Sequence, residues 1–370
     1  MLWLTYRLFR VQWLIALGAL VAVGVALVAT GPGLVHLYDT TVAPCAAHHD
    51  CPAATTALAA KDHLLQQLGP VVLVLPAVVG MFWGGPLVAR ELETGTTKLA
   101  WTQSVSRLRW LVTKVVLLGL ASVAVAGLLS LMVTWWSSPL DHLTGSPFAQ
   151  GNFDRRDIAP MGYAALAFGL GVFAGTVIRR TLPAMASTLV GFIAVRFADY
   201  EWIRPHIFAP VRAVTAFNAQ NPGAGGGVPG GAWILTNQTI NAAGRVIGAN
   251  GGLDAGGNFG FNVTNSGTLV LSDGQSCPSI VPASALHARL PGGPGAGAAS
   301  RGAGGPPRDL VENIGTYVNE CVHRLGIRTV LTYQPPSRYW PLQWCELGIS
   351  LAVAAALVGL SIWWVRRRLA

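Results

Sequence analysis

Charged residues are scarce in this sequence. Asp, Glu, Lys and Arg together make up 11% of its 370 residues, whereas they account for about 25% of an ordinary soluble domain. A water-soluble core of this length needs more charged surface than that, so a cytosolic enzyme is excluded. The 16 acidic residues are outnumbered by 25 basic ones, but the basic residues are not gathered in one soluble stretch. We therefore expect no nucleic-acid partner.

The sequence also lacks the motifs that catalysis would need. It contains no G-x-x-x-x-G-K-[ST] loop for the phosphates of ATP, no H-E-x-x-H and no G-x-S-x-G. The adjacent His48, His49 and Asp50 are followed by no second ligand cluster at zinc spacing. We therefore expect neither an enzyme nor a metal or cofactor site in this chain.

Long apolar runs are abundant, and a membrane-spanning helix needs about 20 mostly apolar residues. The predicted fold is an all-α membrane protein with six transmembrane helices and a large, glycine-rich, partly β extracellular insert before the last helix. A membrane domain is expected over 1–198, the insert over 199–341, and the last helix with a basic tail over 342–370. The expected spans cover about 11–30, 69–89, 115–136, 158–178, 181–198 and 347–365.

The distribution of Lys and Arg predicts how the chain is oriented, because basic residues near span ends are retained in the cytoplasm. If both termini are cytoplasmic, the inner segments hold 12 basic and 2 acidic residues, which leaves 13 basic and 14 acidic residues elsewhere. We therefore expect a multi-pass protein of the cell membrane, embedded in the lipid bilayer, with cytoplasmic N and C termini.

Of the 44 glycines in the chain, 22 lie in the part of the insert between residues 221 and 305. Its two densest glycine runs are typical of linkers. Between them, residues 232–274 alternate apolar and polar side chains around Asn-Gly-Gly and Ser-Gly turns, which predicts short antiparallel strands. Residues 309–327 carry apolar side chains at helical spacing and predict one amphipathic helix.

Four of the five cysteines fall in the segments expected outside the cytosol, where disulfides persist. Cys45 and Cys51 share the first of these segments, and Cys277 and Cys321 share the last. Each pair is a candidate disulfide, although connectivity cannot be read from sequence. Cys345 begins the last span and is expected to be an unpaired small apolar residue.

The polar loop between the second and third spans, residues 90–114, is the most informative stretch. It begins with Arg90, Glu91 and Glu93, can turn tightly at Gly95, and then mixes Trp and Leu with basic residues. An amphipathic helix along the membrane surface fits this pattern. The alternative is a plain interfacial loop that its Trp and Arg side chains anchor.

This loop resembles the permeases of the ABC type-2 exporter family, in the form found in actinobacterial ABC transporter permease subunits. The resemblance rests on E-x-x-x-G-T followed by a Ser-Arg pair ahead of a span, formed by Glu91, Gly95, Thr96, Ser106 and Arg107. The closing segment YQPPSRYWPLQWCELGI, with its apolar run and WWVRRRL, is similar to the end of such proteins. The glycine-rich insert lies outside the resemblance.

The resemblance implies a second permease copy or a related permease, and a coupling helix that docks on a separate ABC ATPase subunit. ATP and Mg would then bind in that partner and not in this chain. The residues expected at the ATPase contact are Glu91, Glu93, Gly95, Thr96, Thr97, Lys98, Ser104, Ser106 and Arg107.

Two small-residue motifs, Gly80-x-x-x-Gly84 and Gly171-x-x-x-Gly175, permit helices to approach closely, either within the chain or against a second permease copy. The apolar spans favour export of a hydrophobic or amphipathic cargo. The alternative function is a membrane-anchored extracellular binding or sensing protein that acts through 199–341. A secondary carrier is disfavoured, because Arg196 and Glu346 lie near span ends and are expected at the membrane interface.

Overall fold

The computed structural model divides into two compact units. The membrane unit comprises Met1–Phe208 and Pro336–Ala370, and the insert unit comprises Ala209–Pro335. Sequence alone places the corresponding boundaries after residues 198 and 341. The residues that the structure describes are 2–37, 39–40, 63–94, 107–144, 148, 152–217, 228–229, 231–249, 261–263, 268–271, 274–277 and 319–368.

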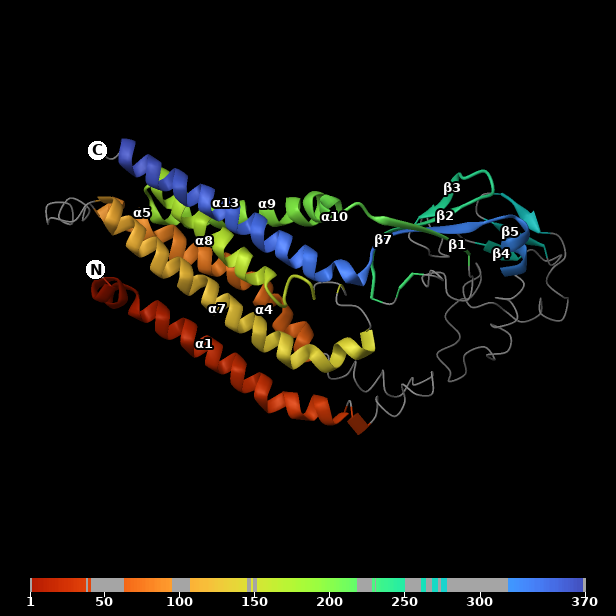
Figure 1. The fold of residues 1–370 in the computed structure, drawn as a ribbon, viewed down its shortest axis with the longest axis horizontal. Helices are drawn as coiled ribbons and strands as arrows, with labels where there is room; N and C mark the ends of the chain where they lie inside the picture. The colour runs from red at the N-terminus through yellow and green to blue at the C-terminus, as the bar shows by residue number, and fades with distance from the viewer. Residues whose placement is uncertain are drawn as a thin grey trace, which may run out of the picture. The chain divides into compact units, whose positions relative to one another are not determined.

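The membrane unit is helical, and six helices in the described ranges are long and apolar enough to cross a membrane, as the sequence predicts. Both chain termini lie at the same end of this unit (Figure 1). The elements are α1 (Leu2–Leu37), α4 (His63–Val79), η2 (Gly80–Gly84), α5 (Gly85–Thr94), α7 (Arg107–Thr144), α8 (Ala159–Ile178), α9 (Thr181–Ala198), η3 (Asp199–Ile203), α10 (Arg204–Ile207), η4 (Pro336–Arg338) and α13 (Tyr339–Arg368).

The second span is interrupted by a π-helical turn, η2, whose glycines pack directly on α8. A Cβ atom at Gly80 would lie 2.5 Å from the Ala167 carbonyl oxygen, and one at Gly84 would lie 2.7 Å from that of Phe168. On the other side, a Cβ atom at Gly175 would lie 2.6 Å from the Gly85 carbonyl oxygen. The two glycine motifs therefore face each other within one chain, and they let the two backbones touch.

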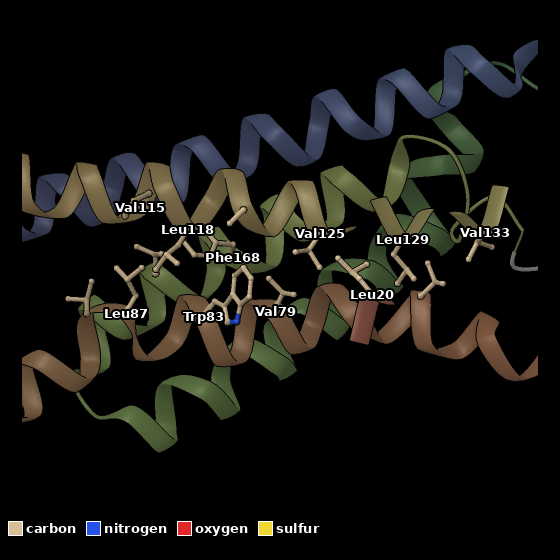
Figure 2. Close-up of a cluster of buried hydrophobic side chains, with 14 of the residues drawn as sticks. Leu20, Val79, Trp83, Leu87, Val115, Leu118, Val125, Leu129, Val133 and Phe168 are labelled. Carbon is tan, nitrogen blue, oxygen red and sulfur yellow. The ribbon is translucent and has the colours of Figure 1, made fainter. Parts of the chain in front are cut away.

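The apolar core of the membrane unit lies among α4, α7 and α8, with one side of α1 against it. Trp83, at the π turn, is surrounded by Val79, Leu118 and Phe168, as Figure 2 shows. The six-helix arrangement buries α8 most deeply, because α8 packs against the second span, α7, α9 and α13. Much of α1 and α9 instead exposes apolar side chains, which is the pattern of lipid-facing helices.

The insert unit contains two small antiparallel sheets among the described residues, and strands β2 to β5 lie within the range 232–274 where the sequence predicts strands. One sheet has the order β1-β7-β2-β3 and a second has β4-β5-β6. Residues 319–324 are helical, and the earlier part of the predicted helix lies outside the described residues. The strands are β1 (Val211–Ala216), β2 (Trp233–Ile240), β3 (Val246–Ala249), β4 (Phe261–Val263), β5 (Leu269–Leu271), β6 (Ser276–Cys277) and β7 (Arg328–Gln334).

Strands β1 and β7, which begin and end the insert unit, were not predicted. They pair along their whole length, from Val211 opposite Tyr333 to Ala216 opposite Arg328. The chain therefore leaves α10 and returns to η4 along two hydrogen-bonded neighbours.

We expect Gly80→Ala to destabilise the membrane unit by about 1–3 kcal/mol, because the added methyl group has no room against the α8 backbone. Thermal unfolding of the purified chain in detergent measures the effect. The matched control is Gly359→Ala, since a Cβ atom at Gly359 in α13 meets nothing within 4 Å. Equal stability of the two variants would contradict the close packing.

Candidate functional site

The two carboxylates that begin the polar loop are both bound within the chain. Glu91, near the end of α5, forms a salt bridge with Lys114 of α7, whose side chain is only 4% exposed. Glu93 accepts hydrogen bonds from Thr181, at 3.0 Å from the backbone N–H and 2.6 Å from the side-chain hydroxyl. Because Thr181 is the first residue of α9, Glu93 joins α5 to the start of another helix.

The Glu93 contact is also favourable electrostatically. The hydroxyl and backbone N–H of Thr181 lower the pKa of the Glu93 carboxyl below its usual value. A carboxylate at a helix N-terminus is stabilised by the unpaired N–H groups and the positive end of the helix dipole. Three helices therefore meet at the point where the polar loop begins.

The remaining residues predicted at the ATPase contact fall largely on the loop itself. Arg107 is the first residue of α7. Gly95, Thr96, Thr97, Lys98, Ser104 and Ser106 lie outside the described residues, as do Cys45 and Cys51. In the insert unit, Cys277 and Cys321 are joined by a disulfide with Cα atoms 5.8 Å apart, and Cys345 is a free cysteine.

A second polar site lies at the opposite end of α8, where five elements bring ionisable side chains together. We call it the buried ion cluster. Its members come from the 152–158 loop, α8, α9, η3, α10 and α13, and none of the charged side chains is more than 14% exposed. They are Asp154, Tyr163, Arg196, Asp199, Arg204 and Glu346.

Arg204 is the centre of this cluster. Its Nη2 donates to Asp154 Oδ1 at 2.5 Å and to Glu346 Oε2 at 3.2 Å, while its Nε donates to Glu346 Oε1. The same guanidinium lies 4.6 Å from the centre of the Phe153 ring. Arg204 immediately precedes the insert unit and Glu346 follows it, so this ion pair joins the two segments that connect the units.

Arg196 completes the pairing. Its guanidinium donates to Asp154 at 2.7 Å and to Asp199 at 2.5 Å, and it stacks 3.7 Å from the centre of the Tyr163 ring. Burial raises the pKa of Asp154, but the positive charges of Arg204 and Arg196 outweigh this and hold it below its usual value. Asp154 is therefore ionised.

The loop that carries Asp154 is fixed on both sides. Ser130 donates to the Asp157 carbonyl at 2.8 Å, and Thr134 accepts the Asp157 backbone N–H at 3.1 Å. Gln343, fully buried on α13, accepts the Ala159 backbone N–H at 2.8 Å and donates to the Phe153 carbonyl at 3.0 Å. These contacts hold Asp154 in place without using its carboxylate.

The cluster corrects the expectation for Arg196 and Glu346. Both were expected at the membrane interface, but Glu346 is only 1% exposed, and both pair with buried partners. Sequence reasoning did not identify Asp154, Tyr163 or Arg204, because they lie far apart in the chain and follow no motif. The sequence offered one indication of this site: acidic and basic residues both occur near the ends of the expected spans that meet there.

An apolar cleft of about 380 Å³ opens between α1, the second span and α7. Leu20, Val79, Trp83 and Leu129 contribute to its lining, and Figure 2 shows Val79 beside Trp83 and Leu20 beside Leu129. At one end, Gln12 donates to the Phe82 carbonyl at 3.3 Å, and its buried Oε1 has no hydrogen-bond partner among the described residues. The lining that the cleft presents is thus almost wholly apolar.

Six helices long and apolar enough to cross a membrane are the framework of a multi-pass membrane protein. The model of the ABC-2 membrane transporter related family matches residues 17–204, and the chain belongs to this family. Comparisons with curated proteins and with solved structures find no match. Membership implies, in general, partnership with an ABC ATPase, and permease subunits generally lack ATPase activity themselves.

We expect Arg204→Gln to destabilise the chain by about 3–5 kcal/mol, because it leaves buried carboxylates without their main cation. Denaturation of the purified chain measures the loss. Arg212→Gln, which removes an exposed arginine of β1, is the control. A double variant with Asp154→Asn should recover part of the lost stability, and no recovery would contradict the pairing.

Proposed function

We propose that this chain is the permease subunit of an ATP-driven exporter, with the polar loop at 95–106 docking on a separate ABC ATPase. The observation that carries the proposal is the pair of contacts at the start of the loop: Glu91 binds Lys114 of α7, and Glu93 binds Thr181 of α9. A displacement of the loop by its partner would reach both helices directly. The contact residues are those expected from the sequence, with Glu91 and Glu93 at the base of the contact.

The packing around α5 supports such coupling. α5 contacts α8 and α9 and continues directly into the π turn η2. Because the glycine contact with α8 leaves no space for sliding, movement of α5 must carry α8 with it or break the contact. Packed interfaces of this kind switch between discrete arrangements instead of deforming continuously.

The orientation follows from the same loop. ATPase subunits work in the cytosol, so we place the end that carries Glu91 and both termini there (Figure 1). The excess of basic residues at this end agrees with that placement. The Glu346 end then faces outward, together with the oxidised pair Cys277 and Cys321.

The apolar cleft supports a hydrophobic or amphipathic cargo. Its walls are aliphatic and aromatic. A hydrophobic ligand, or the apolar part of an amphipathic one, would match this lining.

Reversing two charges of the loop, Lys98→Glu with Arg107→Glu, should reduce the ATPase subunit that co-purifies with the chain at least about tenfold, since interface charges select partners. The subunit is identified by mass spectrometry and by ATP binding after isolation from host membranes in mild detergent. Arg212→Glu on the insert unit is the matched control. If the double variant co-purifies with as much ATPase subunit as wild type, this contact is ruled out.

The alternative function, sensing or binding through the insert, is favoured by one observation: Ala209–Pro335 forms its own compact unit with its own disulfide. The β1–β7 pairing offers a way to separate the two functions. Because Ala216 and Arg328 are paired at one end of the ladder, a two-residue turn can close the strands into a hairpin.

Replacing residues 217–327 by Asn-Gly should leave the ATPase partner bound and its ATP hydrolysis within about twofold of wild type, because the membrane unit keeps its connecting strands. ATPase assays on the reconstituted complex measure this. A complex that assembles normally but loses all activity would instead favour the insert as the working part.

A further inference from the structure

The buried ion cluster holds an unequal number of charges. Asp154, Asp199 and Glu346 bring three carboxyl groups, while Arg196 and Arg204 bring two guanidinium groups. Fully ionised, it would carry one net negative charge on side chains that are at most 14% exposed. A buried charge without a partner is normally avoided by neutralising the group.

Further charged side chains lie in the loop that carries Asp154. In the 152–158 loop, Asp157 accepts a hydrogen bond from the Tyr339 hydroxyl, and Arg156 acts electrostatically on the same tyrosine. The groups that face Glu346 are Tyr163 from α8, Arg196 from α9, Asp199 from η3 and Arg204 from α10. All four belong to the cluster and are already counted.

The contacts of the Tyr163 hydroxyl also indicate that one carboxyl group is protonated. Its hydroxyl oxygen lies 3.1 Å from Asp154 Oδ1 and also contacts Glu346 Oε2, and it accepts from Arg204 Nη2 at 3.3 Å. A phenol carries one hydrogen and can donate it to only one carboxylate. The second carboxyl contact becomes a hydrogen bond only if that carboxyl supplies its own hydrogen.

The pairing decides which carboxyl carries it. Asp154 receives both guanidiniums, at 2.5 and 2.7 Å, and Asp199 receives Arg196 at 2.5 Å. Glu346 pairs closely with Arg204 alone, while Arg196 lies 4.0 Å away, and Glu346 is the least exposed of the three. Of the two carboxyl groups that contact Tyr163, Glu346 therefore has the weaker compensation for a negative charge.

We propose that Glu346 is a proton-binding site: at neutral pH its carboxyl group holds a proton that it donates to Tyr163 Oη, while Tyr163 donates to Asp154. Release breaks only the O–H bond of Glu346 and passes the proton to solvent, with no change of oxidation state. Arg204 lies in α10, before the insert unit, and Glu346 lies in α13, after it. Because the two side chains are hydrogen-bonded, the proton on Glu346 affects the contact between the segment that enters the insert and the segment that leaves it.

Infrared spectroscopy of the purified full-length chain in D₂O tests the proposal. We expect the carboxylic-acid band of one protonated carboxyl at neutral pH, lost in Glu346→Gln and kept in Glu320→Gln, which removes an exposed carboxylate of the insert unit. Glutamine reproduces the neutral form, since its amide can donate to Tyr163 and accept from Arg204. Absence of the band in wild type, its survival in Glu346→Gln, or its loss in Glu320→Gln would each overturn the assignment.

A second measurement keeps the test independent of how well one variant folds. If the native chain holds one more proton than the unfolded chain, its stability falls as pH rises. We expect the thermal midpoint of wild type to fall relative to that of Glu346→Gln as the pH rises above about 4.3, the ordinary pKa of a glutamate. The variant Tyr163→Phe keeps the ring but removes the phenol hydroxyl that contacts Glu346. The infrared band of this variant should therefore differ in frequency from the band of wild type. A constant midpoint difference, or a band unmoved by Tyr163→Phe, would contradict the proposal. Neither measurement needs the ATPase partner, so failure here leaves the exporter proposal standing.

Discussion

Direct backbone contact between the second span and α8 is the constraint on which the membrane unit depends. Glycines at 80, 84, 171 and 175 remove the side chains that would keep the two helices apart. Since lipid is as apolar as the helices, close packing is a main force that can hold them together in a bilayer. With α8 fixed in this way, its two ends are positioned as well, one near Thr181 and Glu93 and the other at Tyr163 and Asp154.

The two polar sites at the ends of α8 differ in exposure and in how their carboxyl groups are paired. At the α5 end, the carboxylates of Glu91 and Glu93 are partly or fully exposed, and they form single pairs that hold separate helices. At the other end, the carboxyl groups are buried, and they share two arginines within one network. The Glu93 contact is exposed, and exposed contacts contribute little to stability, whereas Lys114, the partner of Glu91, is buried. Breaking a buried network is costly, so the second site fixes structure where the first allows movement.

The sequence predicted the membrane fold well, because a bilayer demands long uncharged helices and these are visible in composition alone. The fifth span, 181–198, matches α9 in full. The glycine motifs were also visible, although only the structure shows that they face each other within one chain. Strands β1 and β7 were missed because each pairs with a segment more than a hundred residues away, which no local pattern encodes.

The same limit explains the candidate sites. Glu91 and Glu93 stood out because they interrupt an otherwise apolar region, but their partners Lys114 and Thr181 became apparent only when the helices were placed in space. Asp154, Arg204 and Glu346 are nearly two hundred residues apart at the extremes. Their association depends on the start of α8, the end of α9 and the start of α13 meeting at one level.

Because β1 and β7 are hydrogen-bonded neighbours, the insert unit is attached to the membrane unit through two adjacent strands. Its chain enters and leaves through adjacent strands, so the span between the attachment points stays the same however long the intervening segment becomes. Closing a longer loop adds only a logarithmic entropy cost. Glycine-rich sequence can therefore accumulate, shorten or be exchanged there over evolutionary time while the helices that cross the bilayer keep their arrangement.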